Sequence, residues 1–228
     1  MIFRDRTDAG KLLAKQLVRY RDAEPVVLAL PRGGVPVALE VAKALKAPLD
    51  LILVRKIGAP HRPELAIGAI VDGGQAEKII NADIVRALNV PESYIEEHAA
   101  RELEEIEWRR RLYLGARPRI NIKDRTAIIV DDGIATGATM LAALRAARRA
   151  GPAKLVLAVP VAPTDTVERL KTECDELICL GAEMDFGAIS LFYVDFPQIN
   201  DDEVVALLTL ATEMAGVPKT RAAQNHDT

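Results

Sequence analysis

The stretch Ala127–Met140, which reads AIIVDDGIATGATM, carries most of the information about the fold and the site. Its first four residues are continuously apolar, as in a strand buried on both faces. Two adjacent carboxylates, Asp131 and Asp132, come next, followed by a turn rich in glycine and threonine and then by a helical segment. Because turn amides and a helix N-terminus both favour negative charge, this order predicts an anion-binding loop.

The residue types in the loop suggest what the anion is attached to. Thr136 and Thr139 add hydroxyl donors without competing charge, which suits a phosphate. The two aspartates would repel a phosphate, but they suit sugar hydroxyls or a hard cation beside it. A phosphorylated ribose satisfies both halves of the loop, and we expect both carboxylates to face the crevice. The alternative is an acidic turn that only caps the helix.

Strand-like and helical segments alternate on both sides of this loop. Apolar runs predict strands at residues 26–30, 49–54, 127–130, 155–159 and 177–180, and helical spacing predicts helices at 8–20, 37–45, 140–150, 164–173 and 201–214. This alternation predicts an α/β fold with a mainly parallel twisted sheet flanked by helices. Neither a Walker A sequence nor a G-x-G-x-x-G sequence after the first strand is present.

Two further segments have clear local signals. Leu65–Val71 and Lys78–Ile80 flank Asp72-Gly73-Gly74, which predicts a hairpin. Residues 91–114 predict a long, charged helix that packs by one narrow apolar stripe, with Arg109–Arg111 complementing the dipole at its end. A homodimer contact through that stripe is the alternative interpretation.

Composition limits the class of protein. The chain has 228 residues and a formal charge of −3, which does not favour nucleic-acid binding. It has two cysteines and no apolar run near the ~20 residues that a membrane span needs. We therefore expect a cytoplasmic protein with no nucleic-acid or membrane partner, built as one domain over residues 1–215 with a disordered tail at 216–228.

The sequence Val130–Thr139, VDDGIATGAT, resembles the phosphoribosyl-pyrophosphate signature of type I phosphoribosyltransferases, and the chain looks like an uncharacterised bacterial group within them. The resemblance implies that Asp131 and Asp132 hold the ribose 2′- and 3′-hydroxyls. It also implies that the 5′-phosphate is wrapped by Gly133, Ile134, Ala135, Thr136, Gly137, Ala138 and Thr139. Mg²⁺ would arrive with the ligand, with Asp131 and Asp132 as candidate contacts and no side-chain metal cluster.

The same resemblance implies an activity. Such an enzyme transfers ribose 5-phosphate from 5-phosphoribosyl-1-pyrophosphate to a nitrogenous acceptor and releases pyrophosphate. Both substrates are small molecules, and the acceptor is not identified by the sequence. Two alternatives remain open at this point: a regulatory protein that binds the same ligand without catalysis, and an unrelated Rossmann-like enzyme acting on a sugar phosphate.

Basic and glycine residues near two other strand ends complete the expected site. In the family a short turn binds pyrophosphate, often through a strained or cis peptide, and Arg32, Gly33 and Gly34 match it; a plain turn with a solvated arginine is the alternative. Arg55 and Lys56 end a strand and are expected to point toward the same crevice. With Arg32 and Lys56, the third catalytic candidate is Glu64, which lies in an expected mobile loop, Gly58–Ile67, and is otherwise a solvated residue.

The acceptor end is expected to be a hood formed by the N-terminal segment and residues 181–200. Phe186, Phe192, Tyr193 and Phe196 are candidates to stack on a base, or else to plug the core. Enzymes that salvage 6-oxopurines have a loop aspartate where this chain has Ala135, and they carry a lysine that the Val159-Pro160 segment lacks. We therefore expect poor activity with hypoxanthine and guanine.

Overall fold

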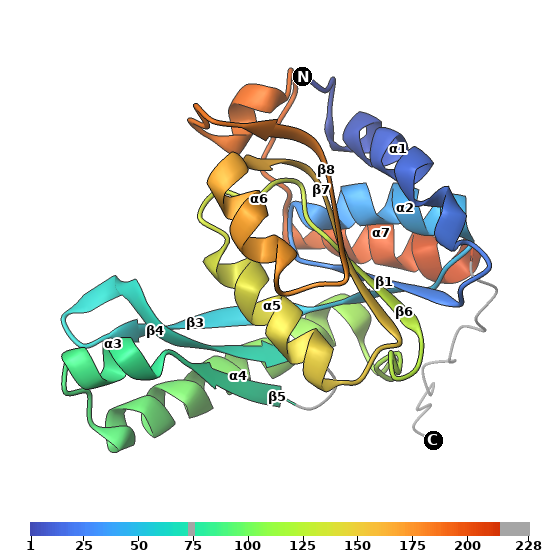
Figure 1. Ribbon diagram of the computed structural model, residues 1–228. Helices are drawn as coiled ribbons and strands as arrows, with labels where there is room; N and C mark the ends of the chain where they lie inside the picture. The colour runs from blue at the N-terminus through green and yellow to red at the C-terminus, as the bar shows by residue number, and fades with distance from the viewer. Residues whose placement is uncertain (73–75, 215–228) are drawn as a thin grey trace, which may run out of the picture.

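A sheet of five parallel strands forms the centre of the computed structural model, which describes residues 1–72 and 76–214 (Figure 1). The spatial order is β2-β1-β6-β7-β8. The strands are β1 (Pro25–Ala29), β2 (Leu49–Leu51), β6 (Thr126–Val130), β7 (Lys154–Pro163) and β8 (Glu176–Glu183). The predicted α/β class with a parallel sheet flanked by helices is confirmed.

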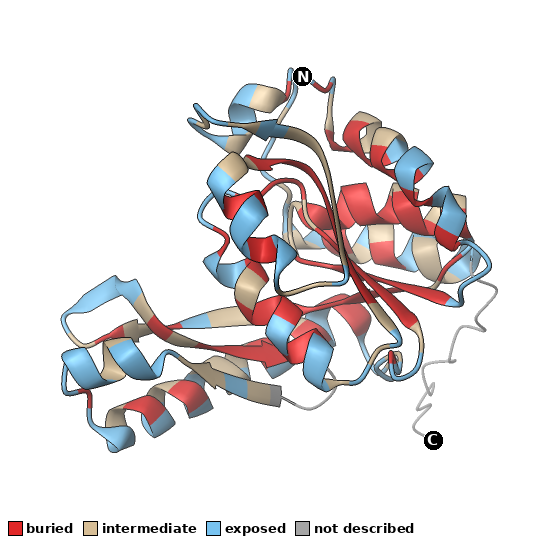
Figure 2. Ribbon diagram, viewed as in Figure 1, coloured by how far each residue is buried: buried red, intermediate tan, exposed pale blue. Residues whose placement is uncertain are grey.

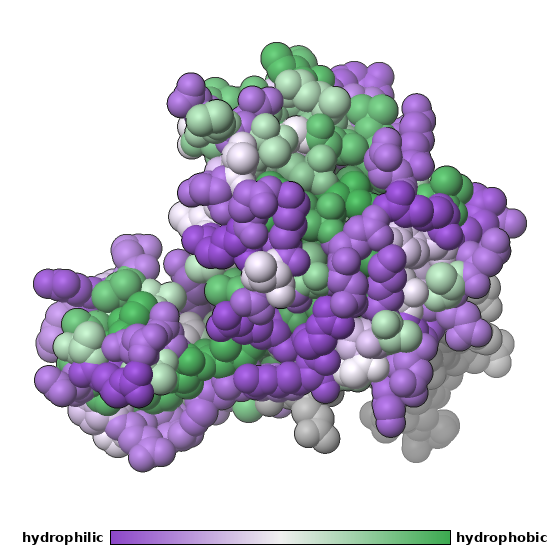
Figure 3. All heavy atoms as spheres, viewed as in Figure 1, coloured by the Kyte–Doolittle hydropathy of each residue, from purple (hydrophilic) through white to green (hydrophobic). Residues whose placement is uncertain are grey.

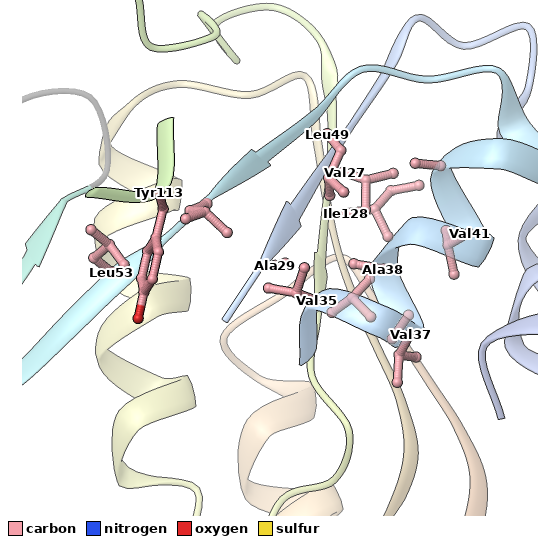
Figure 4. Close-up of a cluster of buried hydrophobic side chains, with 14 of the residues drawn as sticks. Val27, Ala29, Val35, Val37, Ala38, Val41, Leu49, Leu53, Tyr113 and Ile128 are labelled. Atoms are coloured by element: carbon pink, nitrogen blue, oxygen red, sulfur yellow. The ribbon is translucent and has the colours of Figure 1, made fainter. Parts of the chain in front are cut away.

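Helices cover both faces of this sheet. One face packs against α1 (Arg6–Leu17), α2 (Gly34–Leu45) and α7 (Asp201–Met214), and the other against α5 (Ala138–Arg149) and α6 (Thr164–Lys171). Side chains of a strand alternate between faces, so Val27 and Ala29 of β1 meet Val35 and Ala38 of α2 (Figure 4), whereas Val26 packs on the opposite side. Strands β1 and β6 are consequently buried along their whole length, whereas the edge strand β8 is mostly half-buried (Figure 2).

A second sheet of three antiparallel strands projects from the first. It consists of β3 (Leu53–Ala59), β4 (Arg62–Asp72) and β5 (Ala76–Ile80), with α3 (Ala82–Ala87) and α4 (Glu92–Leu114) alongside. The hairpin predicted around Asp72 is confirmed by the β4–β5 pairing, and residues 73–75 of its turn lie outside the described residues. The strand predicted at 49–54 is divided into β2 and β3, because these two strands belong to different sheets.

The loop predicted at Gly58–Ile67 is wrong. Those residues continue β3 and β4 as an antiparallel pair, with Ala59 opposite Arg62 and the turn at Pro60 and His61. His61 adopts a left-handed φ of 59°, which the tight turn requires. Glycine and proline indicated the turn correctly, and the register of the two strands shifts beside Gly58. The strands on either side of the turn are held by hydrogen bonds to each other, which the local sequence did not reveal.

Helix α4 was predicted within one residue at its N-terminus. Its apolar stripe, which includes Ile95, Ala99, Ile106 and Tyr113, is buried inside the chain's own core. The alternative of a dimer contact through this stripe is therefore wrong, while homodimer formation by another surface stays a prediction. The arginines at its end are not all solvated either, because Arg110 is buried on the same face as the stripe.

Arg110 is the centre of a buried ion network that joins the two sheets. Its Nη2 donates to both carboxylate oxygens of Asp50 on β2, at 3.1 and 3.2 Å. Its Nη1 donates to Asp72 at the end of β4, at 3.1 Å, and Arg119 also pairs with Asp72. Asp50 and Asp72 are 4% and 2% exposed, and removing the arginine partners would leave their buried carboxylates without these charged hydrogen-bond donors.

We expect the substitution Arg110→Lys to lower the free energy of unfolding by about 1–3 kcal/mol. Lysine keeps the charge but loses the forked donors that reach both aspartates at once. Chemical denaturation of the two proteins measures the difference. An unchanged denaturation midpoint would mean that the network contributes nothing to the joining of the two sheets.

Exposed apolar side chains gather at the end of the molecule where the N-terminus lies (Figure 3). They include Met1, Ile2, Met184, Leu191 and Val194. Within the described ranges, no helix combines the length and apolar character needed to cross a bilayer. The tail predicted to be disordered, residues 216–228, lies outside the described residues.

Candidate functional site

Two turns meet where β1 and β6 end side by side. The Leu30 amide donates to the Val130 carbonyl oxygen at 3.0 Å, and the next peptide along, Pro31–Arg32, is cis, as the resemblance implies. The following two glycines touch the acidic pair. A Cβ on Gly33 would lie 2.0 Å from Asp132 Oδ2, and a Cβ on Gly34 would lie 2.9 Å from the Asp131 Cα. Only glycine allows this close approach.

The two carboxylates differ in their surroundings. Asp131 is partly exposed, and its Oδ1 accepts a hydrogen bond from the Asp132 amide at 2.8 Å. Asp132 is 8% exposed, and its Oδ2 accepts from Arg6 Nε at 2.7 Å. The expectation that both side chains face the crevice is therefore wrong for Asp132, because Arg6 and the Gly33 turn enclose it.

Electrostatics at the pair favour a positive or hydrogen-bonding ligand. Burial raises the pKa of Asp131 well above its usual range, and the neighbouring Asp132 raises it further. Burial also raises the pKa of Asp132, although the hydrogen bond and charge of Arg6 act in the opposite direction. Hydroxyl donors or a cation placed here would relieve both effects, because each stabilises the ionised carboxylates.

The loop that follows the pair leaves several of its residues exposed. Gly137 has a left-handed φ of +73°, and a Cβ there would lie 2.8 Å from Thr166 Cγ2, so the position requires glycine. The Ile134 amide is used by the Val161 carbonyl oxygen at 2.9 Å, which fixes the buried start of the loop. The exposed positions are Ala135, Thr136, Ala138 and Thr139, while Gly133 is buried. Thr139 lies in the first turn of α5, where amides lack partners within the helix.

The Arg32 side chain extends toward α7. Its Nη1 lies 3.7 Å from Asp201 Oδ1, and that same oxygen accepts a hydrogen bond from the Tyr113 hydroxyl at 2.6 Å. Burial and then Asp201 raise the pKa of Tyr113 to about 12, so the phenol remains a donor. Arg32 is about one third exposed and is held beside the turn that carries it.

The expectation that Arg55 and Lys56 point into one crevice is wrong. They are consecutive residues of β3, and consecutive strand residues face opposite sides. Arg55 lines a cavity of about 180 Å³ together with Pro31 and Thr139. Lys56 lines a separate cavity of about 470 Å³, which includes Ala138 on the other side of the start of α5.

The smaller cavity contains a second arginine, Arg109 of α4, for which the sequence indicated only a role within the charged helix, in the dipole and in an i,i+4 pair with Glu105. Arg55 Nε pairs with Glu102 at 2.8 Å and Arg109 Nε with Glu105 at 2.6 Å, so both guanidinium groups are held by carboxylates of α4. The cavity beside Pro31 and Thr139 thus has two positioned cations. The available sequence signal was the i,i+4 spacing of Glu105 and Arg109, which places both on one face of the helix.

Glu64 lies on β4, exposed and near the turn of the β3–β4 hairpin. Figure 1 shows this hairpin extending away from the segment that contains residues 189–192. Its catalytic role stays a prediction.

The N-terminal segment and residues 192–196 pack together above the acidic pair. The Phe3 amide donates to the Phe192 carbonyl oxygen at 2.8 Å, and the Val194 amide donates to the Phe3 carbonyl oxygen at 2.9 Å. Tyr193 is buried, and its hydroxyl donates to the Asp132 carbonyl oxygen at 2.6 Å. Phe192 stacks on Phe186, with ring centroids 4.9 Å apart. Tyr193 is therefore a buried residue that holds the main chain of Asp132, whereas Phe192 is only partly buried.

Arg6 is the site residue that sequence reasoning missed. In addition to its bond with Asp132, its Nη1 donates to the Pro197 carbonyl oxygen at 2.7 Å. Its Cζ lies 3.7 Å from the centroid of the Phe196 ring. An arginine at the first position of an amphipathic helix normally looks solvated, so no sequence signal marks this burial.

Comparison with known proteins agrees with this geometry. The family model described as phosphoribosyl transferase domain matches residues 4–196. A Mycobacterium tuberculosis (strain H37Rv) protein named "Putative phosphoribosyl transferase Rv0571c" is 47% identical over 210 residues, covering 92% of this chain and 47% of its own length. The crystal structure of TT1426 from Thermus thermophilus is 45% identical, has a TM-score of 0.80, and covers 91% of this chain and 98% of that one. This chain thus spans about half the length of the curated relative. It belongs to the phosphoribosyl transferase domain family.

Proposed function

We propose that this protein transfers ribose 5-phosphate from 5-phosphoribosyl-1-pyrophosphate to a nitrogenous acceptor. The observation that carries the proposal is the contact of two turns, in which Gly33 and Gly34 lie directly against Asp132 and Asp131. On this proposal the loop after Asp132 would hold the phosphate, Asp131 would bind the sugar, and the glycine turn beside them would bind the pyrophosphate. A ligand with a phosphate at one end and a pyrophosphate at the other matches that order.

The chemistry would be a substitution at C1 of the ribose. A bond forms between C1 and the acceptor nitrogen while the bond from C1 to the pyrophosphate oxygen breaks, and the leaving group takes the electron pair. The transition state carries positive charge on the sugar and negative charge on the pyrophosphate, so positioning and charge neutralisation should dominate catalysis. On this proposal the leaving group would be stabilised by Arg32 of the glycine turn and by Arg55 and Arg109, which line the cavity beside Pro31 and Thr139. Lys56, on the opposite face of β3, contributes only if the hairpin moves.

Mg²⁺ fits this site as a cation shared with the ligand. In the two described ranges, no group of three or more His, Cys, Asp and Glu side chains could hold a metal by itself. The pKa of the Asp131 carboxyl is raised first by burial and then by the neighbouring Asp132, and a cation would offset both causes. Asp131, and to a smaller extent the enclosed Asp132, are the residues that would hold the ion together with the bound ligand. When bound, the ion would offset the charge of the leaving group.

A regulatory protein that binds the same ligand is the second candidate. The observation that favours it is the position of Ala135, which is exposed in the loop and offers no carboxylate to remove a proton from an acceptor. Release of pyrophosphate with a panel of bases and amines separates the two functions. Binding without release for any acceptor would favour regulation.

We expect calorimetry to detect binding of 5-phosphoribosyl-1-pyrophosphate that depends on Mg²⁺, and the substitution Asp131→Asn to weaken it roughly tenfold to hundredfold. The amide cannot offer a charged acceptor to the ribose hydroxyls. The matched control is Asp22→Asn, an exposed aspartate in the turn before β1 and away from the site, which should bind as the parent does. No heat for the parent protein, with or without Mg²⁺, would reject the proposed function.

A further inference from the structure

Arg6 joins three parts of the chain that are far apart in sequence. It begins α1, its Nε pairs with Asp132 after β6, and its guanidinium contacts the segment at Phe196 and Pro197. Only about one tenth of its side chain is exposed. A buried arginine that donates to a carboxylate and to a carbonyl oxygen, and that also stacks on an aromatic ring, is held in a single orientation.

The carboxylate of Asp132 is confined by this arrangement. Arg6 Nε lies 2.7 Å from Oδ2, and the same oxygen is 2.0 Å from the position that a Cβ on Gly33 would take. The main chain is fixed too, because the Asp132 carbonyl oxygen accepts from the Tyr193 hydroxyl at 2.6 Å. Turning the carboxylate toward a ligand would break the ion pair inside the protein. Asp131 makes no ion pair among those recorded for the described residues and is more exposed.

We propose that Arg6 is a positioning residue, which fixes Asp132 against the Gly33 turn and leaves Asp131 as the carboxylate that contacts the sugar. The inference rests on the proposed function, since it assigns separate tasks within the same site. It gives the two neighbouring aspartates different roles. Asp132 connects the phosphate loop to the turn and to the aromatic segment, and Asp131 binds the ribose hydroxyls.

A lysine could not replace Arg6 in this role. Its single ammonium group cannot reach Asp132 and the Pro197 carbonyl oxygen in the same geometry, and it lacks a flat face to stack on Phe196. The substitution Arg6→Lys therefore keeps the charge and removes the orientation. Arg110 offers a matched control, because it is equally buried at 8% exposed and pairs with Asp50 and Asp72 away from this site.

The test compares Arg6→Lys with Arg110→Lys by calorimetry, using 5-phosphoribosyl-1-pyrophosphate and Mg²⁺. We expect both substitutions to lower the melting temperature. Arg6→Lys should weaken binding about tenfold or more, while Arg110→Lys should stay within about twofold of the parent. Asp131→Asn should weaken binding more than Asp132→Asn does. Unchanged affinity in Arg6→Lys, or equal losses from the two aspartate substitutions, would overturn the proposal.

A second arm needs no ligand. The unfolding free energies of Arg6→Gln, Asp132→Asn and the double variant form a cycle, and we expect the double variant to lose less than the sum of the single losses. Additive losses would overturn the anchoring of Asp132 by Arg6. If the parent protein binds no 5-phosphoribosyl-1-pyrophosphate, the proposed function and the role of Asp131 fail together. The cycle then still decides whether Arg6 anchors Asp132, so the two failures are distinguishable.

Discussion

The substitution Gly33→Ala is expected to reduce turnover of 5-phosphoribosyl-1-pyrophosphate by about a hundredfold or more, because small displacements of positioning groups can have effects of that size. Backbone strain is not the cause of this expected loss. Gly33 has φ −61° and ψ −33°, which alanine adopts readily at the start of a helix. The new methyl group would instead lie 2.0 Å from Asp132 Oδ2 and 2.6 Å from its Cγ. Either the carboxylate or the Pro31–Gly34 turn must move.

Moving the Asp132 carboxylate would cost free energy, because it would break a buried ion pair with Arg6. The displacement should therefore pass to the Pro31–Gly34 turn, which on the proposed function would bind the pyrophosphate. Steady-state kinetics and a melting curve measure the two consequences separately. We expect a large loss of turnover with a modest change in melting temperature, since alanine also favours the helix that follows.

Gly181→Ala is the matched control, because a Cβ at that position would meet its nearest atom, Val161 Cγ1, at an ordinary distance of 3.6 Å. The same chemical change is made there with room available. Turnover in Gly33→Ala equal to that of Gly181→Ala would mean that the two turns are not held together as the structure places them.

Features with a local signal could be predicted from the sequence. The strand, acidic pair, glycine turn and helix of Ala127–Met140 appear in the predicted order, and α7 spans the predicted residues Asp201–Met214. In each case neighbouring residues determine the outcome through apolar periodicity or turn chemistry. The same applies to the hairpin at Asp72, where β-forming runs flank the turn.

Features that depend on distant pairing could not be predicted. Arg6 and Asp132 are separated by 126 positions, and Arg110 and Asp50 by 60, so neither buried ion pair leaves a mark in its own sequence window. The hairpin at Gly58–Ile67 is an intermediate case. Its glycine and prolines obscured the strands, and once the strands are known, alternation alone places Arg55 and Lys56 on opposite faces.

Hypoxanthine and guanine are expected to be poor acceptors for this protein. An enzyme that transfers to a 6-oxopurine gains from a general base near the attacking nitrogen, and such a base typically contributes 10²–10⁴-fold, which is roughly the deficit expected here. Ala135 is exposed in the loop, and its carbonyl oxygen accepts from the Thr166 hydroxyl at 3.3 Å, so this position holds no side-chain base. Val159 is fully buried and Pro160 follows it, so this segment offers no lysine to select a 6-oxo group.

Glu64 is the remaining carboxylate candidate, and its position on an exposed hairpin strand requires that hairpin to move before it could act. Steady-state rates with hypoxanthine, guanine, adenine, uracil and orotate test the expectation directly. Efficient turnover of either 6-oxopurine would contradict it. Should adenine be turned over, Glu64→Gln can be compared with Glu104→Gln, an exposed glutamate on α4. Loss of turnover in the first variant alone would identify Glu64 as the base and would require the β3–β4 hairpin to reach the site during the reaction.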